Sequence, residues 1–242
     1  MKCLNCCGTN VIKKGKRKTK FGSRQFYYCQ DCEKGFIDSK LPHKTYGPKV
    51  ITSAISCYNL GDTLEASAKL TNSRFKVKVS KSSVSQWLKD QKDICTYHKI
   101  RPAILKKYGK NILVSKTFKH NDLAYNFKYH KPKLEMLCKN NFPSLITYIK
   151  KFEKGCPAFF DDIKNRCSQI KIEVDIKKKS KYNNACRLAS LALKSCNLNS
   201  QRHSAVENFM LINDSSAIAC EVPVWPAPLD NLWCTMYTFY KV

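Results

Sequence analysis

Two cysteine pairs in the first 32 residues have the spacing of a metal-binding site. Cys3 and Cys6 form one C-x-x-C pair, and Cys29 and Cys32 form the other. Two thiolates at this spacing can hold one side of a metal ion, so two pairs supply the four tetrahedral ligands of a closed structural Zn²⁺ site. Two disulfides or four unrelated buried thiols are the alternatives. Because no secretory signal precedes the first pair, we expect a reducing, cytoplasmic environment and therefore Zn²⁺.

The segment between the two pairs is strongly basic. Its six cations are Lys13, Lys14, Lys16, Arg17, Lys18 and Lys20. Gly15 and Gly22 mark a turn, so the segment predicts a strand, a basic turn and a second strand that ends at Cys29, which is the arrangement of a zinc ribbon. On a metal-clamped scaffold the cations would contact phosphates, which positions DNA without reading its sequence. A solvated loop and a nuclear-localisation signal are the alternatives.

A glycine follows each cysteine pair, Gly8 after the first and Gly35 after the second. Glycine permits left-handed backbone, which the turn around each pair, here called a knuckle, often needs. We therefore expect these two glycines to provide it. Cys7, immediately after Cys6, is not expected to be a ligand.

Three side chains near the C-terminus could bind a divalent cation. His203 and Glu207 stand four residues apart on one face of a helix predicted over 202–212, and Glu221 lies on a strand predicted over 217–225. Carboxylate oxygens are the ligands that Mg²⁺ prefers. A resemblance of this part of the chain to nucleases makes the group a candidate catalytic site. A surface ion pair on the helix is the alternative.

The chain that carries these residues is strongly basic. Its formal net charge is +26 over 242 residues, and residues 181–242 hold only 5 Lys and Arg against 4 acids, so the excess lies in the first three quarters. Nucleic acid is the leading partner, because phosphate binding releases counterions. An anionic membrane surface is the alternative, but no strongly amphipathic basic helix with aromatic anchors appears. No apolar run approaches the roughly 20 residues of a membrane span. The ten cysteines outside the two pairs are expected to be small buried side chains.

Helical periodicity begins after a short linker. The spacing of apolar residues predicts a helix that begins at Pro48 and ends at Gly61. Asp62 and Glu65 then have the spacing of a capping box, with Asp62 as the cap of a second helix that ends near residues 71–73. The expected buried residues of that helix are Leu64, Ala68 and Leu70.

A third helix has a stronger start signal. Ser80 is a good N-cap, and Val79 and Val84 flank it with the spacing of a hydrophobic staple. Val84, Trp87 and Leu88 form one apolar face. The remaining faces carry Lys81, Ser82, Ser85, Gln86 and Lys89. Small polar residues with Gln and Lys suit the major groove of DNA, so we expect recognition by this helix; an amphipathic surface helix is the alternative.

Residues 1–95 resemble the N-terminal region of insertion-sequence transposases. The resemblance rests on the two C-x-x-C pairs around a Lys-rich insert, on Leu-Glu-Ala-Ser-Ala from Leu64, and on Val-Ser-Lys-Ser-Ser-Val-Ser-Gln-Trp-Leu from Val79. In that family a zinc ribbon and a helix-turn-helix bind the transposon ends, which implies double-stranded DNA as the partner. The stretch 72–79 departs from the pattern, because it is longer than a tight turn and lacks the usual glycine.

The remainder of the chain predicts further strands and helices. A hairpin is expected from residues 112–118 and 123–129. Its second strand carries alternating aromatic residues, Tyr125, Phe127 and Tyr129. These rings would form either the core side of a sheet or a platform on which bases stack. The other predicted elements are a strand over 170–176 and helices over 132–140, 143–154 and 182–196.

The C-terminal part is also similar to the opening of RecB-like nucleases of the PD-(D/E)XK superfamily, through Glu207 on its helix and Glu221 on its strand. That family binds Mg²⁺ with a later Asp and an acid-x-Lys hairpin, and this sequence lacks the hairpin. A DDE transposase needs three carboxylates on a sheet to hold two metal ions. Asp175 and Asp230 could be two of them, but no acid follows Asp230. Mg²⁺ is therefore expected only if the chain is a nuclease.

These features predict a multidomain α+β protein with a zinc ribbon (1–41), a helix-turn-helix (48–97) and an α+β region (101–242) that is an incomplete nuclease-like domain. The predicted function is sequence-specific binding of double-stranded DNA by a transposase-like, mobile-element-derived protein, without a membrane partner and with incomplete catalytic residues. An active Mg²⁺-dependent nuclease or transposase, a zinc-ribbon module that binds protein or RNA, and assembly as a homodimer remain open.

Overall fold

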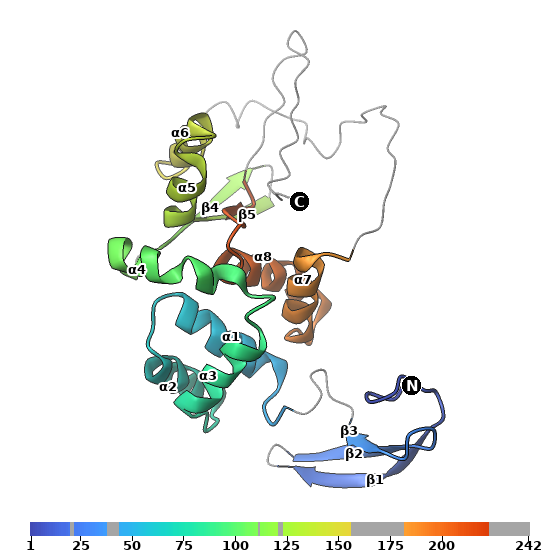
Figure 1. Cartoon of the computed structure of the whole chain (residues 1–242). Helices are drawn as coiled ribbons and strands as arrows, with labels where there is room; N and C mark the ends of the chain where they lie inside the picture. Colours follow the sequence, from blue (N-terminus) through green and yellow to red (C-terminus); the bar gives the residue numbers. More distant parts are fainter. Residues whose placement is uncertain (20–21, 38–43, 111, 121–122, 156–181, 223–242) are drawn as a thin grey trace, which may run out of the picture.

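The structure, a computed structural model, describes residues 1–19, 22–37, 44–110, 112–120, 123–155 and 182–222. Figure 1 shows a small sheet near the N-terminus, a group of helices, and a second small sheet beside further helices. The predicted α+β class is confirmed. Lys20, Asp175, Asp230 and the strand predicted over 170–176 lie outside the described residues. No helix in the described ranges combines the length and the apolar character needed to cross a bilayer.

The N-terminal sheet contains β1 (Val11–Thr19), β2 (Gly22–Cys29) and β3 (Gly35–Ile37), in that order and with antiparallel neighbours. The two predicted strands are therefore present. The prediction of a basic turn between them is wrong for residues 13–18, because these residues lie inside β1.

A β-bulge explains why the strand continues through a glycine. Gly15 has a φ of +76°, and the register between β1 and β2 shifts between Lys13 and Lys16. Gln25 of β2 stabilises the bulge, because its Nε2 donates a hydrogen bond to the Gly15 carbonyl at 2.6 Å. Glycine adopts this left-handed backbone without strain, so a residue that predicts a turn from sequence instead bends the strand.

Three helices follow the N-terminal sheet: α1 (Pro48–Asn59), α2 (Leu64–Phe75) and α3 (Lys81–Asp90). The predicted cap of α3 is confirmed, because the Ser80 side chain accepts a hydrogen bond from the Ser83 N–H at 3.2 Å. The predicted cap of α2 is wrong. Thr63 caps this helix by accepting from the Ala66 N–H at 3.1 Å, while the Asp62 carboxylate pairs with Lys110.

Helix α2 is longer than predicted, and two of its three expected core residues are confirmed. Leu64 packs against a buried cluster of the helical group, as expected. The helix ends at Phe75, where Lys76 adopts a left-handed φ of 53°. Ala68 is buried as expected, but Leu70 is 46% exposed. Ser67 and Thr71 are buried in its place. The inner face of α2 is therefore formed by Leu64, Ala68 and two small polar side chains, and hydrophobic periodicity does not detect the polar ones.

Two C-terminal helices complete the core of the helical group. They are α7 (Asn184–Lys194) and α8 (Arg202–Asn213), preceded by a short 3₁₀ helix η4 (Asn199–Gln201). One buried cluster joins them to the first three helices through Ile51, Ile55, Val84, Trp87, Leu188, Leu191, Phe209 and Met210. A buried hydrogen bond from Asn59 Nδ2 to Asn213 Oδ1, at 2.8 Å, connects α1 to α8. The predicted helices over 182–196 and 202–212 are confirmed.

The second sheet contains β4 (Leu113–His120), β5 (Leu123–His130) and β6 (Ala219–Cys220), which confirms the predicted hairpin. The 3₁₀ helix η1 (Thr96–Lys99) and α4 (Arg101–Tyr108) precede it, and α5 (Lys131–Cys138) and α6 (Pro143–Lys151) follow. Phe127 and Tyr129 are fully buried, in one cluster with Leu134, Ile149 and Phe152. These two rings belong to the core, so the base-stacking alternative is excluded for them.

Candidate metal centre and nucleic-acid interface

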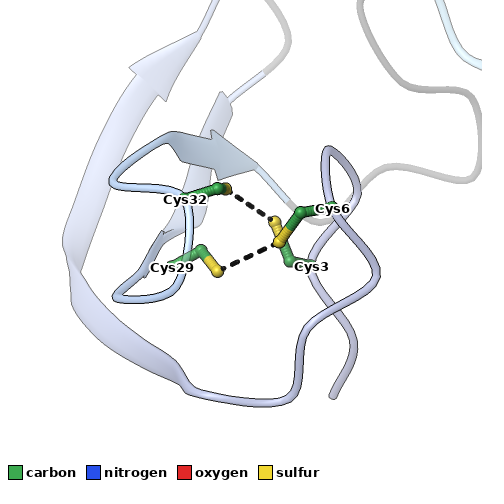
Figure 2. Close-up of side chains that lie close together, drawn as sticks. All are labelled: Cys3, Cys6, Cys29 and Cys32. Atoms are coloured by element: carbon green, nitrogen blue, oxygen red, sulfur yellow. Dashed lines mark hydrogen bonds between the residues drawn. The ribbon is translucent and has the colours of Figure 1, made fainter.

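The four predicted cysteine ligands converge on one point. The Sγ atoms of Cys3 and Cys32 are 3.6 Å apart, as are those of Cys6 and Cys29, and all four lie within 4.8 Å of one another (Figure 2). Four thiolates at about 2.3 Å from a tetrahedral metal ion would be about 3.8 Å from each other. The cluster therefore has the size and the donor set to hold one metal ion.

The two knuckles have the same backbone design. The Cys3 N–H donates to the Gly8 carbonyl at 2.8 Å, and the Cys29 N–H donates to the Lys34 carbonyl at 3.1 Å. In each knuckle the residue directly after the second cysteine is left-handed: Cys7 has a φ of 63° and Glu33 a φ of 55°. The expectation that Gly8 and Gly35 provide this backbone is wrong.

The two glycines are needed for close packing instead. A Cβ atom on Gly8 would lie 2.0 Å from Asp31 Oδ2, and one on Gly35 would lie 2.2 Å from the Phe26 ring. Asp31 stands in the second knuckle and Phe26 on β2, so both glycines allow neighbouring segments to approach. Cys7 is exposed and lies outside the cluster, as expected.

Backbone hydrogen bonds favour an ionised thiol at Cys3. Burial raises the pKa of this thiol. Hydrogen bonds from the backbone N–H groups of Cys6 and Asn5, and then from the Cys29 and Cys32 thiols, outweigh this effect and lower the pKa to about 6. The Asn5 N–H lies 3.3 Å from the sulfur. Thiolate is the form that binds metal ions, so the knuckle backbone prepares one ligand for coordination.

The predicted basic segment forms an exposed strand. The side chains of β1 that were predicted to contact DNA are all exposed: Lys13, Lys14, Lys16, Arg17 and Lys18. Two of them cover aromatic rings on β2. Lys14 Nζ lies 4.7 Å from the centre of the Tyr28 ring, and Arg17 Cζ lies 3.9 Å from that of Phe26.

Helix α3 presents the polar side chains that the sequence predicts. Val84 and Trp87 are buried in the helical core. Ser85 is half-buried, and the exposed members of the predicted set are Lys81, Ser82, Gln86 and Lys89. Gln86 is held within the helix, because its Nε2 donates to Asp90 Oδ1 at 2.9 Å.

Asp90 is a residue of this surface that the sequence did not single out. It also forms an ion pair with Lys44, on the segment that leads into α1. Hydrogen bonds from Lys44 and then Gln86 hold the pKa of the Asp90 carboxyl below its ordinary value. The carboxylate therefore fixes the orientation of Gln86. Asp90 follows Gln86 by four residues, a spacing at which side chains on a helix contact each other. This spacing is the sequence signal that could have identified Asp90.

The three C-terminal candidates also come together. His203 Nδ1 lies 3.5 Å from Glu207 Oε2 and 3.9 Å from Glu221 Oε1. Glu221 directly follows β6, and it accepts a hydrogen bond from the Asn126 N–H of β5. Burial and the neighbouring Glu221 raise the pKa of the Glu207 carboxyl, while His203 opposes the shift. The three ligand atoms lie within 4.8 Å of one another, so they could hold a cation, although His203 is largely exposed.

Comparison with protein-family models, with curated proteins and with solved structures finds no match for this chain. The assignment of function therefore rests on the residues and their geometry.

Proposed function

We propose that the chain binds double-stranded DNA with sequence preference, using α3 as the recognition helix and the cations of β1 as phosphate contacts. The observation that carries this proposal is the division of α3 into two faces. Val84 and Trp87 anchor the helix in the core, while Ser82, Gln86 and Lys89 face solvent. A helix held in this way can enter the major groove without exposing apolar surface.

The ribbon supplies the second part of the proposal. We infer that its four thiolates hold Zn²⁺, because a tetrahedral sulfur set favours this ion. The cations of β1 lie on a strand rather than on a loop, so their spacing is fixed by the sheet. Phosphate contacts made by such a strand would strengthen binding to every sequence, whereas base contacts from α3 would select among sequences.

The order of the elements supports a transposase-like, mobile-element-derived origin. A metal-binding ribbon precedes three helices, the last of which has a polar exposed face, as the resemblance to insertion-sequence transposases implies. Binding of a transposon end is the form of DNA recognition that this origin suggests. The proposal itself requires only duplex binding and base preference.

Separate variants test the two contact types. Replacing Lys16 and Lys18 with Gln should weaken binding to all duplexes and reduce the slope of log affinity against log salt by about 0.9 for each lost phosphate contact. Replacing Gln86 with Ala should instead reduce discrimination between sequences by about 1–3 kcal/mol, the contribution of one paired base contact. Lys139→Gln, at an exposed residue next to the end of α5, is the control for the loss of a cation outside the proposed contacts.

Fluorescence anisotropy at several salt concentrations measures both effects. The proposal predicts a shallower salt slope for the β1 variant and an unchanged slope for the Lys139 control. If the β1 and α3 variants both lower affinity uniformly across sequences, α3 is not the recognition helix.

A further inference from the structure

The two faces of the ribbon sheet differ in character. Along β2, Gln25, Tyr27 and Cys29 alternate with Arg24, Phe26 and Tyr28, so the two sets point to opposite sides of the sheet. Tyr27 stacks on Phe36 with ring centres 5.8 Å apart, and both contact the buried cluster around Cys3 and Cys29. This side of the sheet is therefore occupied by the metal centre.

The opposite side combines aromatic rings with cations. Phe26 and Tyr28 lie there, each with a cation of β1 over its ring: Arg17 for Phe26 and Lys14 for Tyr28. In a regular strand, residues 14 and 17 would point to opposite sides, because side chains alternate. The bulge at Gly15 adds one residue, which brings both cations to the same face.

This face, which we call the aromatic face, is accessible in the structure. Phe26 and Tyr28 are half-buried, and Ile12, which pairs with Tyr28 across the sheet, is 43% exposed. Because Gly35 has no side chain, the Phe26 ring can lie close to the backbone of β3. The rings therefore lie close to the sheet, and the cations lie over them.

We propose that the aromatic face binds unpaired DNA bases, which stack on Tyr28 and on the Arg17 guanidinium that Phe26 supports. Phosphate contacts alone need cations and do not need rings. Inside a duplex both faces of each base are covered by neighbouring base pairs, whereas an unpaired base has a face free to stack on a protein surface. Aromatic residues interleaved with cations are the usual means of binding single strands.

The charge of the ribbon is complementary to this ligand. The aromatic face carries Lys14, Arg17 and Arg24, and no acidic residue of β1 or β2 opposes them. This inference rests on the proposed binding of DNA but adds a second site and a second form of the ligand.

An abasic oligonucleotide provides a matched probe. We would compare the zinc-loaded full chain on an oligothymidylate of about 16 nucleotides and on an abasic strand with the same number of phosphates. Stacking predicts that the oligothymidylate binds at least about fivefold more tightly, with the same salt slope for both strands. Equal affinities would overturn the inference, as would tighter binding of oligouridylate than of oligothymidylate.

Variants locate the effect on the aromatic face. Tyr28→Leu should remove most of the preference for the oligothymidylate over the abasic strand, while Lys18→Gln should weaken binding to both strands equally. Metal content and circular dichroism confirm that the ribbon of each variant is folded. If the preference persists in folded Tyr28→Leu and Phe26→Leu proteins, the bases stack elsewhere and the assignment is wrong.

The two proposals can fail independently. Loss of the single-strand preference with intact duplex discrimination by α3 would remove only this inference. Absence of duplex discrimination would remove the proposed function, and the comparison of the two single strands would still report on stacking.

Discussion

The side chain of Asn72 makes two hydrogen bonds with the backbone of Val79, across the connection between α2 and α3. Its Oδ1 accepts from the Val79 N–H at 2.6 Å, and its Nδ2 donates to the Val79 carbonyl at 2.9 Å. The amide thereby closes a connection that lacks glycine, with Lys76 as its left-handed residue. Because Val79 directly precedes the cap Ser80, Asn72 fixes where α3 begins.

Replacing Asn72 with Ala should therefore lower both stability and DNA affinity. Two hydrogen bonds of about 0.5–1.5 kcal/mol each are lost, so the free energy of unfolding should fall by about 1–3 kcal/mol. Ser73→Ala, an exposed neighbour on α2, should change it by less than about 0.5 kcal/mol. Urea denaturation of both variants measures the difference, and equal stabilities would show that the connection does not depend on this amide.

The metal centre should contain one Zn²⁺ per chain. Cys29→Ser removes one of the four converging thiolates, so it should abolish stoichiometric binding and unfold the ribbon. Cys7→Ser is a matched control, because Cys7 neighbours the first pair but lies outside the cluster. Metal analysis of the purified proteins and circular dichroism after chelation measure both effects. Wild-type protein that contains well under one equivalent of metal, and in which the thiols of Cys3, Cys6, Cys29 and Cys32 react freely, would contradict this assignment.

Stability should fall in mild acid because of His130. This residue is fully buried and caps α5, with its Nδ1 accepting from the Lys133 N–H. Burial, and then the Lys133 charge, lower the pKa of the folded imidazole to about 2, from an unfolded value near 6.5. Between these values the unfolded chain binds a proton that the folded chain does not. Below about pH 6.5 the free energy of unfolding should therefore decrease, by up to about 1.4 kcal/mol per pH unit.

The variant His130→Asn isolates this effect, because asparagine keeps an N-cap acceptor but does not titrate. Its stability should depend less on pH than that of the wild type between about pH 5 and 6.5. His98→Asn, at an exposed histidine, should retain the wild-type dependence. Identical pH profiles for wild type and His130→Asn would contradict the buried neutral state.

The cluster of His203, Glu207 and Glu221 should not by itself support phosphodiester cleavage. Mg²⁺ keeps most of its water shell unless enough oxygen ligands hold it, so two glutamates should bind it weakly. We expect no cleavage of linear or supercoiled DNA by the purified chain with Mg²⁺ or Mn²⁺. Cleavage that disappears in Glu207→Gln or Glu221→Gln protein would overturn this prediction, whereas cleavage that survives both changes would indicate a contaminant.

Local signals in the sequence correctly predicted the cluster of four cysteines and the cap of α3. The spacing of Cys3, Cys6, Cys29 and Cys32 depends only on short turns, and the cap at Ser80 depends only on the next three residues. Local signals failed where the same few residues are compatible with two different backbone structures. Gly15 suits a turn as well as a bulge, and its hydrogen bond from Gln25 decides between them.

Contacts between distant segments could not be predicted from periodicity. The apolar face of α7 indicated burial, but not that Leu188 and Leu191 join one buried cluster with residues of α1 and α8. Lys133 is a further example, because a lysine in a basic chain is expected at the surface. It is fully buried and donates to the carbonyls of Leu211, Asp214 and Ala217, which connects α5 to the last turn of α8 and to the segment that follows. Burial lowers the pKa of this ammonium to about 7.

Selection from a random pool of duplex oligonucleotides tests the central claim most directly. If α3 reads bases, wild-type protein should enrich one motif and bind it at least about a thousandfold more tightly than unselected duplex. Gln86→Ala should change the preferred base at one or two positions of that motif, and Cys7→Ser should select the wild-type motif. A pool without an enriched motif, or the same motif for the wild type and Gln86→Ala, would contradict the account.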